Sequence, residues 1–419
     1  MHTKNSKPLP SPFRLSTIGD KQLLNIENKT ELKMKKYLTS TMRFFLFVLG
    51  ILIIDTKVLA NEVNRIYRSA DFLGRGHAGI ANPNQEDSLF YNPSNLSGKS
   101  DSTTTAEENQ TDQSTMTEPI AKDDFFKKAV ILSPLFTLSQ NASQLTSAGS
   151  DSSKTLEALR DLVGKPVHAG FDSFSGVILK NMAIGAVLSG NVNLYVYKDS
   201  NNSGVEAVKI DGSQNQVLSF GYGDRVINDN LQIGGTIKYL NRTQISADVS
   251  IADIQAIKDF NLTNFQNQGS GLGADLGTTY STNWKWNPKF ALTIMDIGDT
   301  QLDFAEGKTV NGDPIRQTIN IGVAAKPDIN HFDTELFFDI RDLEGRDEPV
   351  GWKRLHLGAS IRRWQLGLNL GINQGFGTMG LFYEAKLLRI DIGSYGEEVG
   401  QRVGYRPSAR YFFRLASSF

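Results

Sequence analysis

The sequence predicts an all-β protein, a transmembrane antiparallel β-barrel of about 14 strands. Three observations lead to this fold class: strands with one apolar face and one face of small polar residues, connections that alternate between long and short, and a chain that ends in a strand. In a barrel of this kind the apolar face of each strand contacts lipid, and the other face lines a polar interior.

The clearest strand pattern lies between Leu355 and Asn373. Apolar residues alternate there with small and polar ones, and the alternation is interrupted only near Trp364. Successive side chains of a strand point to opposite faces, so this stretch predicts two strands joined by a tight turn. The polar face carries Gly, Asn, Ser and Gln rather than Lys, Glu and Thr, which favours a barrel interior over the solvent face of a soluble sandwich.

The composition excludes several classes of protein. The 419 residues include no cysteine, which excludes a disulfide scaffold, a cysteine zinc site and an acylated lipoprotein. No apolar run reaches the length of about 18 residues that a transmembrane helix needs. Residues 1–60 carry ten Lys and Arg against four Asp and Glu, and the rest of the chain is acidic, so no nucleic-acid-binding face is predicted.

The basic start is explained by a signal peptide at residues 34–60. Met34, Lys35 and Lys36 precede an apolar run at residues 44–54. Small or β-branched residues follow at residues 58–60, where signal peptidase would cleave. The run is too short to span a membrane. We expect residues 1–33 to be an upstream extension or a mis-called start, and the mature chain to begin at Asn61.

Residues 61–96 do not alternate and form a compact segment with turns at Gly and Pro. Its sequence includes Leu73-Gly74-Arg75-Gly76, Ala78-Gly79 and Asp87-Ser88-Leu89-Phe90-Tyr91-Asn92-Pro93. At these residues the chain resembles the long-chain fatty-acid transporter (FadL/TodX-type) family of the outer membrane. That family opens with a hatch that bears a similar Leu-Gly-Arg-x-x-Ala-Gly, then an acidic residue and Phe-aromatic-Asn-Pro-Ala; here Ser94 stands in place of the last Ala.

The resemblance covers about thirty residues directly and the strand pattern in outline. It implies that residues 61–96 form an N-terminal hatch inside the barrel lumen. It also implies an outer-membrane channel for the passive uptake of hydrophobic small molecules such as fatty acids. The hatch residues carried over from the family pattern are Leu73, Gly74, Arg75, Gly79, Asn92 and Pro93.

Residues 97–126 are rich in Ser, Thr, Glu, Asp and Gln and have few apolar residues. Such a segment cannot bury enough surface to order itself, so we predict a flexible polar insertion. The outer-membrane β-barrel is expected to occupy residues 127–419. Its predicted strands cover residues 129–139, 167–179, 182–197, 214–224, 230–243, 271–281, 288–297, 315–326, 332–341, 353–363, 365–373, 379–386, 388–396 and 408–419, and the pair between 379 and 396 could instead be one long strand.

The predicted connections alternate in length. Bacterial outer-membrane barrels have short periplasmic turns and longer outside loops, so the alternation assigns the long connections to the outside. A short connection at residues 374–378 is the exception. The long connections are residues 140–166, 198–213, 244–270, 298–314, 342–352 and 397–407.

The last predicted strand places Ala409, Tyr411, Phe413, Leu415 and Phe419 on one face. An ordinary edge strand of this kind would leave an apolar ribbon prone to aggregation, whereas closure of the barrel removes the edge. A terminal strand that ends in Phe also resembles the signal recognised by the outer-membrane barrel assembly machinery. We therefore expect Phe419 to contribute to a contact with that machinery.

Two long loops have helical patterns, at residues 154–163 and from 250 to 258. In the resembled family apolar outside loops form a first landing groove for the ligand, while packing on the barrel rim or the hatch is an equal alternative. The family also has a wall gap at a kink in an early strand, and Gly190 and Asn191 of the third predicted strand are the candidates for it. The candidate outside-loop contacts are Leu156, Leu159, Ile251, Ile254 and Ile257.

The polar face of the predicted strands also carries charges. We expect these residues to form ion pairs in the lumen that hold the hatch to the wall, with a selectivity ring as the alternative. The residues are Arg316, Arg362, Arg410 and Arg414 with Asp333, Glu335 and Asp339.

No catalytic, cofactor or metal site is predicted, so the protein is not expected to be an enzyme. The five histidines show no metal-ligand spacing. His356 and Ser360 share an inward face, but about 13 Å of strand separates them, which is too far for a base to activate a nucleophile. The Gly-x-Gly-x-Gly at residues 269–273 precedes no helix, so it is not a phosphate loop.

Two functions remain open at this stage, both at the bacterial outer membrane. In the first, a hydrophobic molecule enters from the outside loops, displaces the hatch and reaches the periplasm or the surrounding lipid. In the second, the protein is a non-transporting accessory or scaffold of a secretion or conjugation system. An apolar tunnel beneath the outside loops would favour transport, and a lumen sealed by ion pairs would favour the accessory.

Overall fold

The computed structural model describes residues 65–97, 126–148, 152–199, 205–227, 229–251, 262–306, 308, 310, 312–347, 351–400 and 404–419. The predicted upstream extension at 1–33 and the signal peptide at 34–60 lie outside these residues. Nearly all of the predicted polar insertion at 97–126 lies outside them as well.

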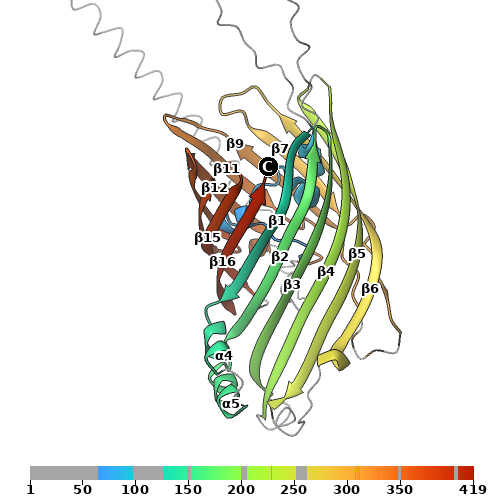
Figure 1. Cartoon of the computed structure of the whole chain (residues 1–419), viewed down its shortest axis with the longest axis vertical. Coiled ribbons are helices and arrows are strands. Elements are labelled where there is room, and N and C mark those ends of the chain that lie inside the picture. The colour runs from blue at the N-terminus through green and yellow to red at the C-terminus, as the bar shows by residue number, and fades with distance from the viewer. Residues whose placement is uncertain are drawn as a thin grey trace, which may run out of the picture. The chain divides into compact units, whose positions relative to one another are not determined.

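Fourteen strands of the described residues form one closed antiparallel sheet (Figure 1). Each strand pairs with its neighbours along the chain, and β1 pairs with β16, so the ring has no free edge. The prediction of an all-β barrel of 14 strands is confirmed, and every strand overlaps its predicted range. The strands are β1 (Phe126–Ser139), β2 (Pro166–Leu179), β3 (Met182–Asp199), β4 (Val205–Val226), β5 (Leu231–Ser250), β6 (Gln266–Ser281), β7 (Lys289–Met295), β9 (Thr318–Ala325), β11 (Phe332–Ile340), β12 (Leu355–Arg363), β13 (Leu366–Asn373), β14 (Phe376–Glu384), β15 (Leu388–Glu398) and β16 (Pro407–Ser418).

Two very short strands extend this ring. β8 (Asp303–Phe304) pairs with β6, and β10 (Asp328–Ile329) pairs with β11. The region between 379 and 396 contains two strands, β14 and β15, which pair with each other rather than forming one long strand.

The strands turn apolar side chains outward and polar side chains inward. On β13, Leu366 and Ile372 are 62% and 45% exposed, whereas Asn369 and Asn373 are buried. This arrangement is the reverse of a soluble domain, where large apolar side chains occupy the interior. It is the arrangement of a barrel whose outer face contacts lipid, and such a closed barrel leaves no backbone group unpaired in hydrocarbon.

The exposed tryptophans lie at the ends of the barrel strands. Trp284 and Trp286 lie in the turn before β7, and Trp364 lies in the turn between β12 and β13. Aromatic residues are enriched where an outer-membrane barrel meets the lipid headgroups. Trp352, also exposed, lies at the opposite end of the barrel in a long connection, so exposed tryptophans mark both ends.

The strands β3 to β6 are longer than predicted, at 18, 22, 20 and 16 residues. A membrane crossing needs only about 9–11 residues, so these strands continue beyond the lipid on the outside. Much of the loops predicted at 198–213 and 244–270 is therefore strand, and those two predictions are wrong. The apolar alternation in fact continues there, with Val208 and Ile210 on β4 and Ile245, Ala247 and Val249 on β5, so the predicted strands ended too early.

Two helices occupy the first outside connection, α4 (Ala142–Ala148) and α5 (Ser152–Asp161). In Figure 1 they lie beside the far ends of the long strands. The helix predicted at residues 154–163 thus corresponds to α5, and most of the helix predicted from residue 250 lies outside the described residues. In the part of the chain that the structure describes, no helix is both long enough and apolar enough to cross a membrane.

Candidate functional site in the barrel lumen

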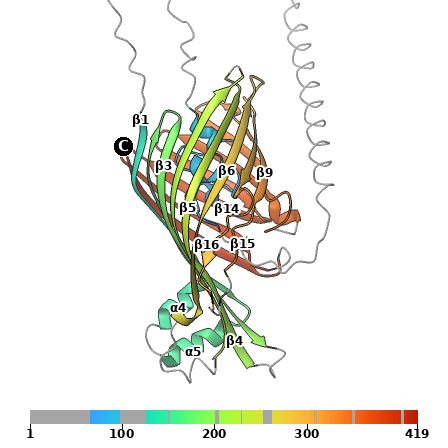
Figure 2. The same cartoon turned by 90° about the vertical axis from the view of Figure 1, so that its right-hand side faces the viewer.

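Residues 65–97 lie inside the ring of strands, and we call them the lumen segment. Its helix α2 (Ala70–Gly74) contacts β13 to β16, whereas its 3-10 helix η1 (Pro93–Leu96) contacts β4 to β6. A second short helix, α3 (Ser88–Tyr91), lies between them and contacts β4. Because strands from opposite sides of the sheet touch the segment, it crosses the lumen, as Figure 2 shows.

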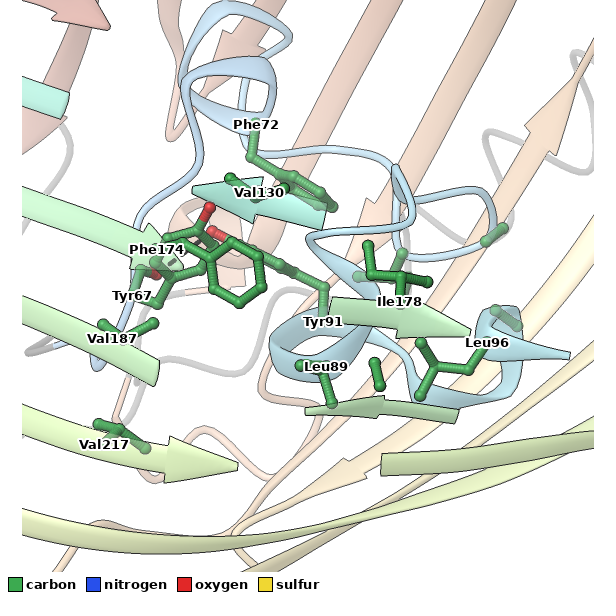
Figure 3. Packing of buried hydrophobic residues seen from close by; sticks show 14 of the residues in the cluster. Tyr67, Phe72, Leu89, Tyr91, Leu96, Val130, Phe174, Ile178, Val187 and Val217 are labelled. Atoms are coloured by element: carbon green, nitrogen blue, oxygen red, sulfur yellow. Dashed lines mark hydrogen bonds between the residues drawn. The ribbon is translucent and has the colours of Figure 1, made fainter. Parts of the chain in front are cut away.

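The lumen segment has an apolar core that it shares with the wall. The rings of Phe72 and Tyr91 stack with their centroids 3.8 Å apart. Phe174 of β2 packs against this group, as Figure 3 shows. The Asp87 carboxylate ties the fold of the segment together, because it accepts hydrogen bonds from the hydroxyls of Tyr67 and Ser69 at 3.2 and 2.7 Å.

The backbone of the segment touches the wall at Gly76. A Cβ atom at Gly358 of β12 would lie 2.4 Å from the carbonyl oxygen of Arg75, and one at Gly371 of β13 would lie 2.4 Å from the Gly76 nitrogen. Gly76 itself has a φ of +70°, a conformation that favours glycine. The segment can therefore approach this wall so closely only because these three positions lack side chains.

A second close contact lies across the lumen at Asn92 and Pro93. A Cβ atom at Gly234 of β5 would lie 2.3 Å from the Pro93 carbonyl oxygen, and one at Gly277 of β6 would lie 2.1 Å from Asn92 Oδ1. The amide of Asn92 donates hydrogen bonds to the Ile80 carbonyl at 2.8 Å and to the Thr279 hydroxyl at 2.9 Å. The Asn-Pro pair is thus fixed to β6 by shape and by hydrogen bonds.

The other predicted hatch residues also lie at contacts with the wall. The backbone N–H of Gly79 donates to Asp339 Oδ2 of β11 at 2.7 Å, and the Gly74 carbonyl accepts from the Thr378 hydroxyl of β14 at 2.9 Å. Leu73 is fully buried in a cluster with wall residues of β1, β15 and β16. The guanidinium of Arg75 lies over the rings of Phe72 and Phe337, at 4.4 and 4.5 Å from their centroids.

A buried cluster of charges joins the segment to β1, β15 and β16, and we call it the ion cluster. Glu86 of the segment pairs with Lys128 at 2.6 Å and with Arg414 at 3.0 Å. Arg414 also pairs with Asp391 at 2.8 Å and with Asp71 of the segment at 3.6 Å. Arg389 completes the cluster through its ion pairs with Asp71 and Asp391. Three carboxylates and three cations therefore balance inside the lumen.

A cavity of about 140 Å³ lies between the lumen segment and the outside ends of β7, β9 and β11. Its lining from the segment is largely apolar and aromatic, with Ile66, Tyr67, Ile80, Phe90 and Tyr91. Its lining from the wall and the loops is largely charged. The charged residues on this cavity are Arg65, Lys238, Arg316, Arg341, Asp296, Asp342 and Asp347.

One carboxyl at the loop side of the cavity has a shifted pKa. Burial raises the pKa of Asp347 to about 6, and the neighbouring Asp342 adds to the rise. The backbone N–H of Asp347 donates to Asp342 Oδ2 at 2.8 Å, which holds the two carboxyls together. The loop side of the cavity therefore loses negative charge as the pH falls through about 6.

The outside-loop candidates are only partly described. Leu159 of α5 and Ile251 at the end of β5 are both buried, in one apolar cluster that includes Val196 and Val208 of the long strands. Leu156 lies in α5, three residues before Leu159, and Ile254 and Ile257 lie outside the described residues. In the described part, Leu159 and Ile251 therefore pack against the long strands.

The predicted wall gap at Gly190 and Asn191 is contradicted. Both residues pair without interruption to β2 on one side and to β4 on the other. The Asn191 amide also donates to the Ser213 hydroxyl at 3.3 Å. Glycine lacks a side chain but still makes both ladder hydrogen bonds, so its presence alone opens no gap. The register of the wall instead shifts in β1, between Val130 and Ser133.

Ion pairs hold the lumen segment to the wall as predicted, but most of the charged residues predicted to form them pair with other wall residues instead. Arg414 contacts the segment, whereas Arg410 pairs with Glu397 at 2.9 Å and Arg362 pairs with Glu384 at 3.0 Å. Asp333 pairs with Lys326 at 2.6 Å. Glu335 and Asp339 reach the segment through hydrogen bonds from neutral groups, the Asn82 amide and the backbone of Gly79 and Ile80.

The described residues contain no group of three or more metal-ligating side chains. His356 uses its ring nitrogen Nδ1 in a 3.0 Å hydrogen bond with the Gly76 carbonyl oxygen, so it holds the segment. The sequence analysis did not identify Glu86, Lys128 or Asp391 as site residues. For Glu86, the available signal was the pair of adjacent acids Glu86-Asp87 just before the apolar run Leu89-Phe90-Tyr91.

No protein-family model matches the chain, and no curated protein matches it in sequence. Among solved structures it is similar to the toluene transporter TodX of Pseudomonas putida, with a TM-score of 0.44 and 12% identity over 87% of this chain and 99% of that chain. It is also similar to a FadL homologue of Pseudomonas aeruginosa, with a TM-score of 0.45 and 9% identity over 86% and 99% of the two chains. A third, the toluene transporter TbuX of Ralstonia pickettii, has a TM-score of 0.39 and 11% identity over 85% and 98%. The chain is a closed antiparallel β-barrel with an apolar outer face, and it is similar in structure, at low sequence identity, to transporters of the FadL/TodX type.

Proposed function

We propose that the protein is an outer-membrane channel for the passive uptake of hydrophobic small molecules such as fatty acids. The observation that carries this proposal is the cavity between the lumen segment and the outside loops. Its aromatic side suits an apolar body, and its cationic side chains suit an acidic or polar end. The chain has no motif for energy coupling, so flow would follow the concentration gradient.

In this proposal the lumen segment is the gate. Leu73, Gly74, Arg75, Gly79, Asn92 and Pro93 contact the wall on both sides of the lumen, so a molecule that leaves the cavity for the periplasm must displace them. Of the apolar outside-loop candidates, Leu156, Ile254 and Ile257 would supply the first contact with the ligand, because Leu159 and Ile251 are buried. Burial of Leu159 and Ile251 holds this outside region in place.

Filling the cavity tests the channel proposal. Ile315 lines the cavity from an outside connection, and Ile315→Trp is expected to reduce uptake of labelled oleate about tenfold, the equivalent of about 1.4 kcal/mol. The matched control is Ile297→Trp, in the same connection, where the native side chain is 41% exposed and does not line the cavity. Equal uptake by the two variants in cells that lack other fatty-acid channels would count against the channel.

One observation favours the second function, a non-transporting accessory or scaffold of a secretion or conjugation system. The ion cluster fixes the lumen segment to the wall. A barrel whose lumen stays closed in this way would transport nothing, as the accessory function requires. Mass spectrometry of apolar molecules that co-purify with the protein separates the two functions. A channel is expected to carry fatty acids or similar molecules, and cells without the protein should grow poorly on them. Normal growth and an empty extract would support the accessory.

We further propose that the barrel assembly machinery recognises the last strand through Phe419. The backbone of Phe419 pairs with Ala129 in both directions, at 2.8 and 3.0 Å, and so completes the seam between β16 and β1. Its ring is 61% exposed and stacks on Phe126, so it is accessible before closure. Deletion of Phe419 is expected to lower the amount of assembled protein in cells severalfold while purified protein still folds in detergent. Unchanged amounts in cells would exclude the recognition.

A further inference from the structure

The lipid-facing wall has a hollow across β9, β11, β12 and β13, which we call the outer groove. Its volume is about 570 Å³, and its sides are formed by outward apolar residues that include Leu336, Phe338, Leu357, Leu370 and Ile372. Small residues, Ala325 and Ala359, lie among them and leave the hollow unfilled.

The floor of the outer groove is unusually thin. It includes Gly358 and Gly371, the two glycines that touch the Arg75–Gly76 backbone from the other side. A side chain at either position would point into the lumen, so only strand backbone separates the groove from the lumen segment there.

Arg363 lies on the same outward face, at the periplasmic end of β12. It pairs with the outward residue Leu366 across the strands, and its side chain is exposed. Its guanidinium lies over the ring of Trp364 at 4.5 Å and over that of Phe332 at 5.5 Å. Neighbouring cations at this end pair with carboxylates, since Arg362 contacts Glu384 and Lys326 contacts Asp333. Arg363 is instead held by rings that leave its nitrogens available.

We propose that the outer groove binds one acyl chain of a phospholipid in the periplasmic leaflet, with the lipid phosphate at Arg363. Leu357 lies six positions before Arg363, which is about 20 Å along a strand. Barrel strands tilt by about 35–45°, so this corresponds to about 15 Å along the membrane normal. Half of a bilayer's hydrocarbon core is also about 15 Å thick, so a chain that starts at Arg363 reaches the groove within its own leaflet. Arginine binds phosphate through paired N–H groups, and aromatic residues beneath it fit the headgroup boundary.

Native mass spectrometry of the whole protein in a mild detergent tests the proposal, with phosphatidylglycerol as the added probe. The wild type is expected to retain one lipid. Ala359→Phe, which fills the groove, should weaken retention at least tenfold, and Arg363→Gln should weaken it severalfold. The matched controls are Ala186→Phe, at an exposed outward position of β3, and Arg225→Gln, at the periplasmic end of β4; both should behave as the wild type.

Diacylglycerol, which has the chains but no phosphate, separates the two parts of the site. It should bind the wild type and Arg363→Gln equally, and it should fail to bind Ala359→Phe. Equal lipid retention by Ala359→Phe and Ala186→Phe would overturn the proposal, as would loss of retention in both. Should Ala359→Phe fail to fold, a fluorescence measurement replaces that comparison. Phosphatidylglycerol with brominated acyl chains is added to a variant in which Trp364 is the single tryptophan, and quenching of the Trp364 fluorescence is recorded. Saturable quenching supports the site, and quenching without saturation overturns it.

Discussion

Gly371→Ala is expected to displace the lumen segment and open the barrel. The new Cβ atom would lie 2.4 Å from the carbonyl carbon of Arg75 and the nitrogen of Gly76. Both are backbone atoms, so neither can move aside as a flexible side chain would. Overpacking of this kind costs about 1–3 kcal/mol, and here it acts on the contact that positions the segment. We expect ion conductance in planar bilayers to rise severalfold, while the barrel keeps its heat-modifiable migration on a denaturing gel.

Gly377→Ala is the matched control for this prediction. Gly377 lies in β14, and a Cβ atom there would meet no other atom within 4 Å. Gly190→Ala is a second control, because its nearest contact would be the Ser213 carbonyl oxygen at 3.7 Å. Both variants should conduct as the wild type does. Wild-type conductance in Gly371→Ala would show that the segment does not depend on this approach to the wall.

Arg414→Met is expected to cause the largest loss of stability among single substitutions in the lumen. Arg414 is 1% exposed and contacts Glu86, Asp391 and Asp71. Its removal leaves three buried carboxylates against two cations, Lys128 and Arg389. Loss of one partner from a buried ion pair costs about 3–5 kcal/mol, because the remaining charge is left without compensation. Denaturant unfolding in detergent should show this loss, and conductance should rise as the segment is released.

A second substitution separates charge balance from packing. Arg414→Met with Asp391→Asn leaves two intact pairs, Glu86 with Lys128 and Asp71 with Arg389, so we expect it to recover a large part of the lost stability. The surface control is Lys326→Met, which breaks an ion pair with Asp333 that is about half exposed. Exposed pairs contribute about 0–1 kcal/mol, so this variant should stay near the wild type. If the double variant is no more stable than Arg414→Met, the cluster does not act through its charge balance.

The strands could be predicted from the sequence because lipid imposes a strict rule on them. A residue such as Ile372 faces hydrocarbon and its neighbour Asn373 faces the lumen, so the pattern repeats every two residues. The same rule explains where the prediction was wrong. Lys209 and Asp211 of β4 lie beyond the lipid in a long strand pair, and charged residues followed by Gly212 there look like a loop although Val208 and Ile210 continue the apolar face.

The sequence predicts which wall residues face the lumen segment but not which residues of the segment they contact. The strand pattern places Arg414, Glu335 and Asp339 on the inward face, which is where they lie. It does not say which part of the segment passes each of them, so the pairing of Arg414 with Glu86 was not foreseen. The glycines at 358 and 371 were recognised as parts of a small inward face. That they meet Gly76 depends on the path of the segment through the closed ring.

The most direct measurement of the central claim, that residues 65–97 cross the lumen of a closed barrel, is an engineered cross-link. The chain has no cysteine, so Ser94→Cys with Thr279→Cys introduces a single pair. The hydroxyl oxygens of these residues lie 2.8 Å apart, one in the segment and one in β6. Mild oxidation of protein in the outer membrane is expected to join them nearly completely, as peptide mass spectrometry would show. Two cysteines that stay reduced in a folded barrel would contradict this placement of the segment.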